Sequence, residues 1–447
     1  MSFSQYTSEF KKNLQLAYPV MLGQLGHVFV GFADNIMVGE LGAAPLAAVS
    51  LANSLVFIAF SIGIGFTLAI TPLVAEADGE KNFKSGNSYF QHGILMSFVL
   101  GLILCALLFL LKPFMSMMHQ PKEVVVYALP YFDIIAYSMV PLLVFQSYKQ
   151  FADGLSQTKY AMRAAVVANI INIGLNYILI YGKLGFPRLE LVGAGIGTLI
   201  SRLIMLGFIV YMVHNKKVFR PFVSSLRFSN IEKKVLKKVF HLGYPSAMQM
   251  LFEIGLFSTA ILLAGMIGTY EQAANQIALN LATITFMIAI GLGVTATVRV
   301  GNQKGLKRYK DLKRIALSVF LLMFLINVVF ASGFILFRDL LPYAYIDNFE
   351  VIKIASSLLI VAGLFQVSDG AQVVLLGALR GLQDVKVPMF YTFVAYWLIG
   401  FPICYYLGLH TNMKTVGVWI GLLVSLTASA IMLYLRFYKL TKNNHRK

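Results

Sequence analysis

The sequence predicts an all-α, polytopic membrane protein with twelve transmembrane helices in two pseudo-symmetric six-helix bundles. Three observations carry this prediction: an apolar composition, long stretches without charged residues, and an internal repeat of the chain. Of the 447 residues, 58% are hydrophobic and only 13% are charged, whereas soluble domains have about 45–50% apolar and about 25% charged residues. A chain this apolar would expose too much hydrophobic surface in water, so soluble enzymes, disordered proteins and fibrous proteins are excluded.

Long stretches of the chain contain no Asp, Glu, Lys or Arg, and among them are 13–33, 41–75, 272–298, 315–337 and 387–413. Each is longer than the roughly 20 residues that a helix needs to cross about 30 Å of hydrocarbon. Turn signals and charge clusters divide the whole chain into further apolar segments of this kind. The twelve expected helices lie near 14–38, 47–74, 93–111, 128–148, 161–181, 191–213, 240–267, 272–298, 315–337, 354–379, 389–408 and 415–435.

Basic residues predict the orientation, because Lys and Arg concentrate in the loops that stay in the cytoplasm. With the N-terminus inside, 29 Lys and Arg fall in cytoplasmic segments and 7 fall in outer loops, while Arg202 lies within an expected helix. We therefore expect both termini and the loop 214–241 to be cytoplasmic. The basic loops facing an anionic leaflet also explain the net charge of +18 without a nucleic-acid partner.

The second half of the chain repeats the first with a shift of 226 residues. Without a gap, 16–79 aligns with 242–305, and the matches include Pro19/Pro245, Gly42/Gly268, Gly65/Gly291 and Gly79/Gly305. Glycine and proline matches weigh most, because these residues record backbone requirements. Six-helix units that begin on the same side of the membrane are parallel repeats, as in transporters. We expect an N-lobe over 1–213, a cytoplasmic linker over 214–239, and a C-lobe over 240–447 with a short basic tail.

Three acidic residues lie inside expected helices, namely Asp34, Glu253 and Asp369. A charge at the bilayer centre costs about 2.5–3.5 kcal/mol on insertion scales, so an intramembrane acid is functional by default. The alternative is a buried ion pair without a transport role. Arg202 is the basic residue that would neutralise an acid in that case.

Polar residues recur with helical spacing beside these acids. Lipid would leave their hydrogen bonds unmet, so we expect them to face a cavity between helices. The alternative for the amides is hydrogen bonding between helices, and the alternative for the histidine is packing in the core. These polar neighbours are Gln24, His27, Asn169, Asn172, Asn176, Gln249, Gln366 and Gln372.

Several of these segments resemble the multidrug and toxic compound extrusion (MATE) family, and in particular its bacterial NorM-like branch. The resemblance covers essentially the whole chain and is carried by Pro19 with Asp34, Phe252-Glu253, 369–381, 276–280 and 299–301. It implies an antiporter rather than an enzyme. Such a protein exchanges inward-moving H⁺ or Na⁺ for outward-moving, mostly cationic and amphipathic organic compounds, by rocking of two lobes in the bacterial plasma (inner) membrane. We expect it to act as a monomer in the bilayer, with no cofactor beyond the coupling ion.

The resemblance also implies two sites. A cation or proton site in the N-lobe would consist of Asp34, Asn172, Asn176 and Thr198. A cation or substrate site in the C-lobe would consist of Glu253, Asp369 and Phe365, where some relatives have Tyr and this chain lacks the hydroxyl. If Na⁺ is the coupling ion, we expect it at Asp34 or at the Glu253/Asp369 pair. Further cavity residues would be Gln24, His27, Gln249, Gln366 and Gln372.

Two other classes of membrane protein were weighed. A lipid-linked saccharide flippase of the same superfamily would share the repeated lobes, but it would need several cavity Arg or Lys for pyrophosphate. Only Arg202 is intramembrane by the expected helices. A membrane acyl or glycosyl transferase would need an acid/base cluster at the interface, and the internal repeat argues against it.

Overall fold

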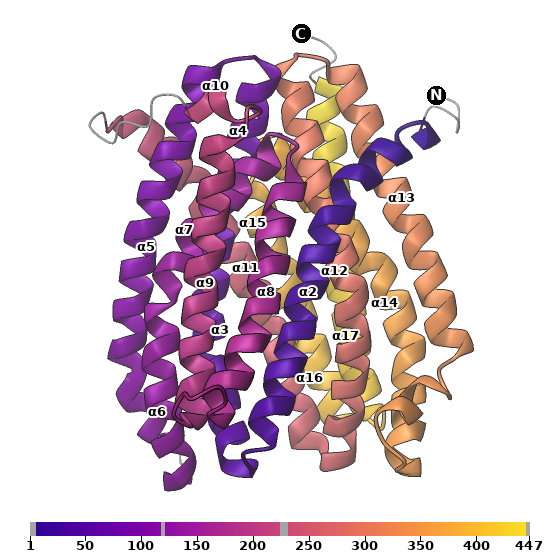
Figure 1. Ribbon diagram of the computed structural model, residues 1–447. Helices are drawn as coiled ribbons and strands as arrows, with labels where there is room; N and C mark the ends of the chain where they lie inside the picture. The colour runs from indigo at the N-terminus through magenta and orange to yellow at the C-terminus, as the bar shows by residue number, and fades with distance from the viewer. Residues whose placement is uncertain (1–5, 118–120, 224–230, 444–447) are drawn as a thin grey trace. The chain divides into compact units, whose positions relative to one another are not determined.

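The computed structural model describes residues 6–117, 121–223 and 231–443, which form helices joined by short turns (Figure 1). Within these ranges, twelve helical spans are long and apolar enough to cross a membrane. Each expected helix overlaps one of them, so the predicted all-α membrane fold is confirmed. Most spans extend past the expected ranges, because hydropathy marks only the part of a helix that matches hydrocarbon. The spans are Phe10–Gly39, Ala43–Gly79, Phe83–Met115, Lys122–Gly154, Thr158–Tyr181, Glu190–Asn215, Lys233–Ile267, Thr269–Gly305, Tyr309–Leu336, Phe349–Gly381, Lys386–Leu409 and Lys414–Lys442.

Three spans are interrupted, and a proline follows each interruption. The ring of a proline clashes with the carbonyl four residues earlier and offers that carbonyl no N–H. Pro72, Pro141 and Pro402 therefore break the helix near Leu68, Tyr137 and Leu398. The third break is a π-helical turn, a form that often marks functional sites. The pieces are α3 (Ala43–Thr67) with α4 (Ile70–Gly79), α6 (Lys122–Tyr137) with α7 (Met139–Gly154), and α15 (Lys386–Phe393), η2 (Val394–Gly400) and α16 (Phe401–Leu409).

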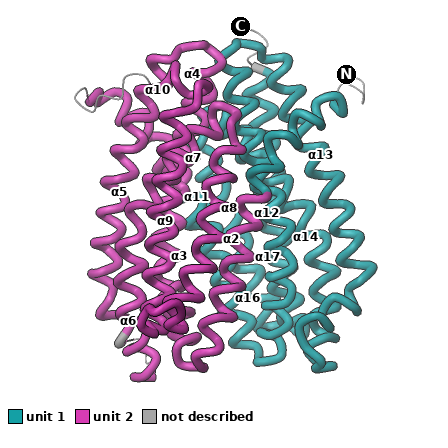
Figure 2. The backbone as a smooth tube through the Cα atoms, in the orientation of Figure 1, with its two compact units in different colours: residues 1–21, 248–447 teal, residues 22–247 magenta. Residues whose placement is uncertain are grey.

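The helices form two compact units, coloured separately in Figure 2. Unit 2 is Leu22–Ala247, and unit 1 combines Met1–Met21 with Met248–Lys447. The boundaries after Met21 and Ala247 lie 226 residues apart, which is also the shift of the sequence repeat. The first 21 residues thus group with the second half, whereas the sequence placed them in the N-lobe.

Two helices contribute residues to both units: α2 (Phe10–Gly39) and α11 (Lys233–Ile267). The remaining helices of unit 2 are α3, α4, α5 (Phe83–Met117), α6, α7, α8 (Thr158–Tyr181), α9 (Glu190–Asn215) and α10 (Arg220–Val223). The remaining helices of unit 1 are α12 (Thr269–Gly305), α13 (Tyr309–Leu336), η1 (Leu341–Ala344), α14 (Phe349–Gly381), α15, η2, α16 and α17 (Lys414–Asn443).

Two glycines related by the repeat show why the first part of α2 belongs to unit 1 and the first part of α11 belongs to unit 2. In unit 2, a Cβ on Gly65 of α3 would lie 2.7 Å from the Cα of Ala247 of α11. In unit 1, a Cβ on Gly291 of α12 would lie 2.6 Å from Cγ of Met21 of α2. Both members of each contact are related by the 226-residue shift. The match of Gly65 with Gly291 therefore records two equivalent close helix crossings.

Polar contacts hold the N-terminal segment against unit 1. Arg299 donates from Nη2 to Oε2 of Glu9 at 2.7 Å, and Arg314 lies 3.4 Å from the other Glu9 oxygen. Arg299 also donates to Asn13, and the amide of Asn13 donates to the hydroxyl of Ser318 at 3.1 Å. We call this cluster the N-terminal clasp.

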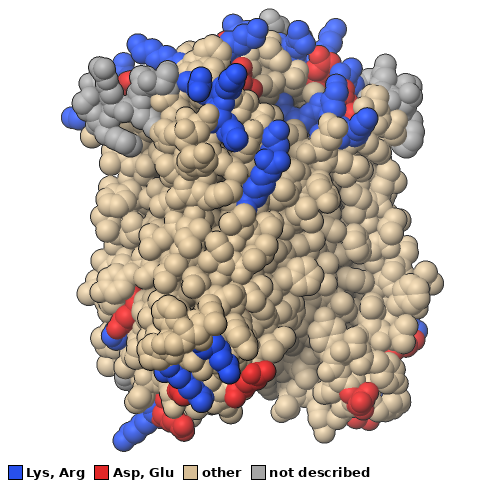
Figure 3. Space-filling model, viewed as in Figure 1, with Lys and Arg blue, Asp and Glu red and all other residues tan. Residues whose placement is uncertain are grey.

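The surface charges are segregated. Figure 3 shows Lys and Arg side chains at both ends of the face in view, with most at the end where α4 and α10 lie in Figure 1 and few in the tan band between the ends. This distribution is what the loop count predicts from sequence.

Candidate functional site

The N-lobe candidates meet in a hydrogen-bonded cluster between α2 and α8. Asn176 donates from Nδ2 to the carboxylate of Asp34 at 2.7 Å, and from the same nitrogen to Oδ1 of Asn172 at 3.3 Å. Asn172 and Asn176 are one helical turn apart, so both side chains lie on the face of α8 that meets α2. Both asparagines are buried, and Asp34 is half-buried.

The fourth N-lobe candidate, Thr198, lies beside this cluster on α9 and is half-buried. It takes no part in the hydrogen bonds that join Asp34 to the asparagines. The preceding residue, Gly197, makes the approach of α9 possible, because a Cβ there would collide with Oδ1 of Asn176. That amide oxygen is buried and has no hydrogen-bond partner among the described residues.

The cluster therefore presents oxygen atoms that are not fully used. They are a carboxylate oxygen of Asp34 and the amide oxygen of Asn176. Hard oxygen ligands suit Na⁺, and a carboxylate among amides accepts a proton equally well. The chemistry of these oxygen atoms suits either small cation.

Four further residues accompany the cluster, and sequence reasoning singled out only one of them, Arg202. The hydroxyl of Tyr131, which is in electrostatic range of Asp34, lies 3.5 Å from Oδ1 of Asn53. Arg202 donates to Ser138 at 2.6 Å, and Ser138 is the residue between α6 and α7. Arg202 thus binds a helix break in its own unit.

The C-lobe acids come from α11 and α14 of unit 1. Glu253 is half-buried, Asp369 is 2% exposed, and the two carboxylates are in electrostatic range of each other. One oxygen of Asp369 is buried without a hydrogen-bond partner in the described part of the chain. Arg380 of α14 is also in electrostatic range of Glu253. From the sequence alone, Arg380 falls among the basic residues of the cytoplasmic segments, because it lies near the end of its helix.

Phe365 lies in the apolar core of unit 1 rather than on an open wall. Its side chain is 2% exposed, and its ring packs edge-on against Trp419 at 5.3 Å and Phe257 at 6.0 Å between centroids. A direct contact of Phe365 with a cation would require this aromatic cluster to rearrange.

The glutamines of the C-lobe have different environments. Gln249 donates to the backbone carbonyl of Val385 at 3.1 Å, and Gln366 accepts a hydrogen bond from Thr285. These two join helices, as the alternative interpretation expected. Gln372 is fully buried, and neither its amide oxygen nor its nitrogen has a hydrogen-bond partner among the residues that the structure describes. The hydroxyl of Tyr396, which is also buried, lies within reach of this amide.

The remaining candidates on α2 do not join the Asp34 cluster. Gln24 is half-buried and His27 is exposed, and neither is bonded to Asp34 or to the asparagines. Asn169 packs against this helix, because a Cβ on Gly26 would lie 2.9 Å from its amide nitrogen. That nitrogen is buried and unpaired within the described ranges.

Known proteins resemble this chain over nearly its full length. The sequence model of the MatE family matches residues 19–178 and 245–406, one match in each repeat. The chain is 34% identical over 439 residues to the multidrug resistance protein NorM of Photobacterium profundum, covering 96% of this chain and 95% of that protein. It is 33% identical over 446 residues to the probable multidrug resistance protein NorM of Rhizobium meliloti, covering 99% and 96%.

A solved structure shares the fold. A MATE crystallised in the bent conformation superposes with a TM-score of 0.90 at 21% sequence identity, over 99% of this chain and 97% of that one. At this identity the likeness concerns the fold alone.

Proposed function

Because the chain belongs to the MatE family, we propose that it is a secondary active multidrug efflux transporter. It exchanges H⁺ or Na⁺ for cationic, amphipathic organic compounds by rocker-type alternating access. The single observation that carries the proposal is the cluster of Asp34, Asn172 and Asn176 within two membrane-spanning helices. A half-buried carboxylate in this position is costly, and its amide neighbours leave oxygens for a small cation.

Exchange follows if the coupling ion and the organic cation compete for the same carboxylates. An ionised acid in a region of low dielectric is unfavourable unless a cation or proton joins it. The N-lobe cluster suits the coupling ion, since its ligands are small and hard. The C-lobe acids Glu253 and Asp369 are in electrostatic range of each other and suit either a shared proton or one monovalent cation, including the charged group of an organic cation.

Alternating access draws support from the repeat. The unit boundaries after Met21 and Ala247 are related by the same 226-residue shift as the sequence. In transporters built from such repeats, one bundle rocks against the other around a fixed site. The loop 214–239, part of which lies outside the described residues, would be the cytoplasmic linker.

The proposal includes a cellular location and an oligomeric state. Relatives of the chain are bacterial, and the segregation of basic residues supports a plasma-membrane protein with both termini in the cytoplasm. We expect a monomer, because each chain carries both lobes and both candidate sites.

A saccharide flippase is the weaker alternative. Two arginines lie in membrane-spanning helices near the candidate sites: Arg202 donates a hydrogen bond to Ser138, and Arg380 is in electrostatic range of Glu253. A pyrophosphate would require several cations at one site, whereas these two arginines belong to different units.

The test is transport by the full-length chain. An efflux-deficient bacterial host expressing it should resist a panel of cationic dyes and extrude them, whereas a neutral polyol should not be exported. Purified protein in proteoliposomes should move dye against its gradient when either a pH or a Na⁺ gradient is imposed. Protection from no dye, together with dye movement that ignores both gradients, would overturn the proposal.

A further inference from the structure

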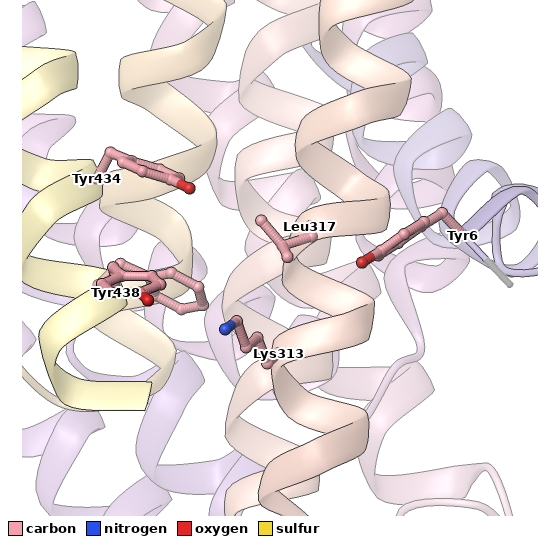
Figure 4. A pocket seen from close by; sticks show the side chains of 6 residues that line it. Tyr6, Lys313, Leu317, Tyr434 and Tyr438 are labelled. Carbon is pink, nitrogen blue, oxygen red and sulfur yellow. The ribbon is translucent and has the colours of Figure 1, made fainter. Parts of the chain in front are cut away.

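Unit 1 contains a cavity of about 290 Å³ that the candidate sites do not use. Its lining comes from the N-terminal segment, α13 and α17, and consists of Tyr6, Lys313, Leu317, Tyr434, Phe437 and Tyr438. Figure 4 shows Lys313 and Leu317 pointing from α13 toward the tyrosines of α17, with Tyr6 approaching α13. The lining thus combines one cation, three phenol hydroxyls and an apolar floor.

The cation in this cavity has no acidic partner among the described residues. The ammonium of Lys313 lies 5.0 Å from the centroid of the Tyr438 ring, and no carboxylate lines the cavity. The next residue, Arg314, is by contrast bound to Glu9 and to Asp311. A lysine without a counter-ion, surrounded by hydroxyl donors, is suited to an anion with several acceptor oxygens.

The wall formed by Tyr6 is held in place by the N-terminal clasp. Ser318, next to Leu317 on α13, donates to the backbone carbonyl of Tyr6 at 2.7 Å. Ser318 in turn accepts a hydrogen bond from Asn13 at 3.1 Å. The cavity is therefore built from ordered contacts and not from a loose terminus.

The cavity lies where a membrane-spanning helix enters the interface. The span of α13 begins at Tyr309, about one turn before Lys313, and Tyr and Lys side chains are typical of this depth. From the cavity, exposed apolar side chains continue at helical spacing along both helices toward the middle of the spans. They are Phe324 and Val328 on α13, and Ile431 and Val424 on α17.

We propose that this cavity binds the head group of an anionic phospholipid, with the phosphate at Lys313 and the tyrosine hydroxyls and the acyl chains along the apolar stripes. Basic pockets between helices on the cytoplasmic side are suited to such head groups. The apolar stripes favour a lipid over a soluble phosphate, because acyl chains would pack against these side chains and a free phosphate would not contact them.

The experiment measures lipid retention by the purified full-length protein. Native mass spectrometry in detergent counts bound phosphatidylglycerol and phosphatidylcholine for the wild type, Lys313→Gln, Tyr438→Phe and the matched control Lys310→Gln. Lys310 is exposed on the same turn of α13 and does not line the cavity. We expect Lys313→Gln to weaken retention of phosphatidylglycerol about fivefold, as for one cation at an anionic surface, and Lys310→Gln to leave it unchanged.

Several results would overturn the proposal. Equal retention by Lys313→Gln and wild type would remove the lysine from the site. Equal retention of phosphatidylcholine would indicate unspecific annular lipid. Displacement of the lipid by millimolar inorganic phosphate would indicate a soluble phosphate site instead. Tyr438→Phe keeps the ring and removes only the hydroxyl, so a weaker but measurable loss in this variant supports a phosphate contact even if Lys313→Gln proves unstable.

Discussion

The amide of Asn176 donates a 2.7 Å hydrogen bond to the carboxylate of Asp34, which lies 142 positions earlier in the chain. This bond uses the donor side of the amide and leaves its acceptor oxygen buried and unpaired among the described residues. The arrangement is therefore asymmetric: Asp34 is held in place, while an oxygen beside it remains available. A site of this kind can gain a small cation without first losing a hydrogen bond.

Replacing Asp34 by Asn should abolish ion-coupled efflux while the protein still reaches the membrane. The substitution keeps the shape of the side chain and removes the charge that holds a cation. Since hydrogen bonds to charged groups are worth about 1.5–3 kcal/mol, we expect any residual dye efflux to be at least about 10- to 100-fold slower than in wild type. Asp133→Asn serves as the control, because Asp133 is bound to Lys112 at 2.7 Å outside the cluster. Normal efflux with unchanged H⁺ and Na⁺ dependence in Asp34→Asn would contradict the assignment.

Gly197→Ala should damage the same site without touching its polar groups. The new Cβ would collide with Oδ1 of Asn176, so the amide must move away from Asp34. Overpacking of this kind costs about 1–3 kcal/mol, and efflux should fall together with the Tm of the purified protein. Gly207→Ala on the same helix has no atom within 4 Å of the added carbon and should behave like wild type. Equal behaviour of the two variants would mean that Asn176 can relax freely.

Glu253→Gln and Asp369→Asn should each impair dye resistance, and the double variant should be little worse than either single one. Partners that share a proton or a cation act as one unit, so their effects are not additive. The measurement is dye efflux at matched membrane expression over a range of pH and Na⁺ concentrations. Arg202→Gln should be milder, because the hydrogen bond of Arg202 goes to Ser138 in its own unit. If the acid variants transport normally, Asp34 alone couples the cycle.

The sequence predicted those parts of the site that depend on spacing along one helix. Asn172 and Asn176 share a face because they are one turn apart, and an apolar background made Asp34 conspicuous. Spacing cannot show which helices meet, so the contact of α8 with α2 followed only from the family resemblance. The same limit applied to the approach of Glu253 and Asp369, which lie on separate helices.

Other features lacked a sequence signal. Tyr131 lies in range of Asp34, but it is one of 22 tyrosines. Arg380 lies close to a helix end, where a basic residue ordinarily belongs to a loop. The proline-linked breaks were hidden as well, because prolines at Pro72, Pro141 and Pro402 interrupt the backbone and not the hydropathy.

The orientation can be checked by cysteine labelling at two exposed positions. Lys217 lies between α9 and α10, and Asp347 lies between η1 and α14. Because basic loops stay inside, an impermeant thiol reagent added to intact cells should label Asp347→Cys and spare Lys217→Cys. Opening the cells should expose both. The native Cys105 and Cys404 are buried, so they provide a low background. Labelling of Lys217→Cys from outside would reverse the topology.

The N-terminal clasp should make stability depend on acidic pH. Burial by itself raises the pKa of the Glu9 carboxyl, but the hydrogen bond from Arg299 and the charges of Arg299, Lys12 and Arg314 outweigh it, so the pKa lies below the ordinary value of 4.5. A carboxyl with a lowered pKa stabilises the fold above its unfolded-state pKa, and this contribution is lost as the pH falls through the lower, folded-state pKa. The Tm of the wild type should therefore drop as the pH is lowered below about 4.5.

Glu9→Gln isolates this contribution. The variant should be less stable than wild type at neutral pH by about 1–3 kcal/mol, since Arg299 loses a charge-assisted hydrogen bond, and the difference should shrink as the pH falls below 4.5. Glu123→Gln is the control, because Glu123 is exposed in the first turn of α6 and should change Tm little at any pH. The measurement is thermal unfolding of the purified protein in detergent at a series of pH values. A difference in Tm between Glu9→Gln and wild type that stays constant down to acidic pH would show that the loss of stability comes from packing. The ion pair with Arg299 would then add no stability.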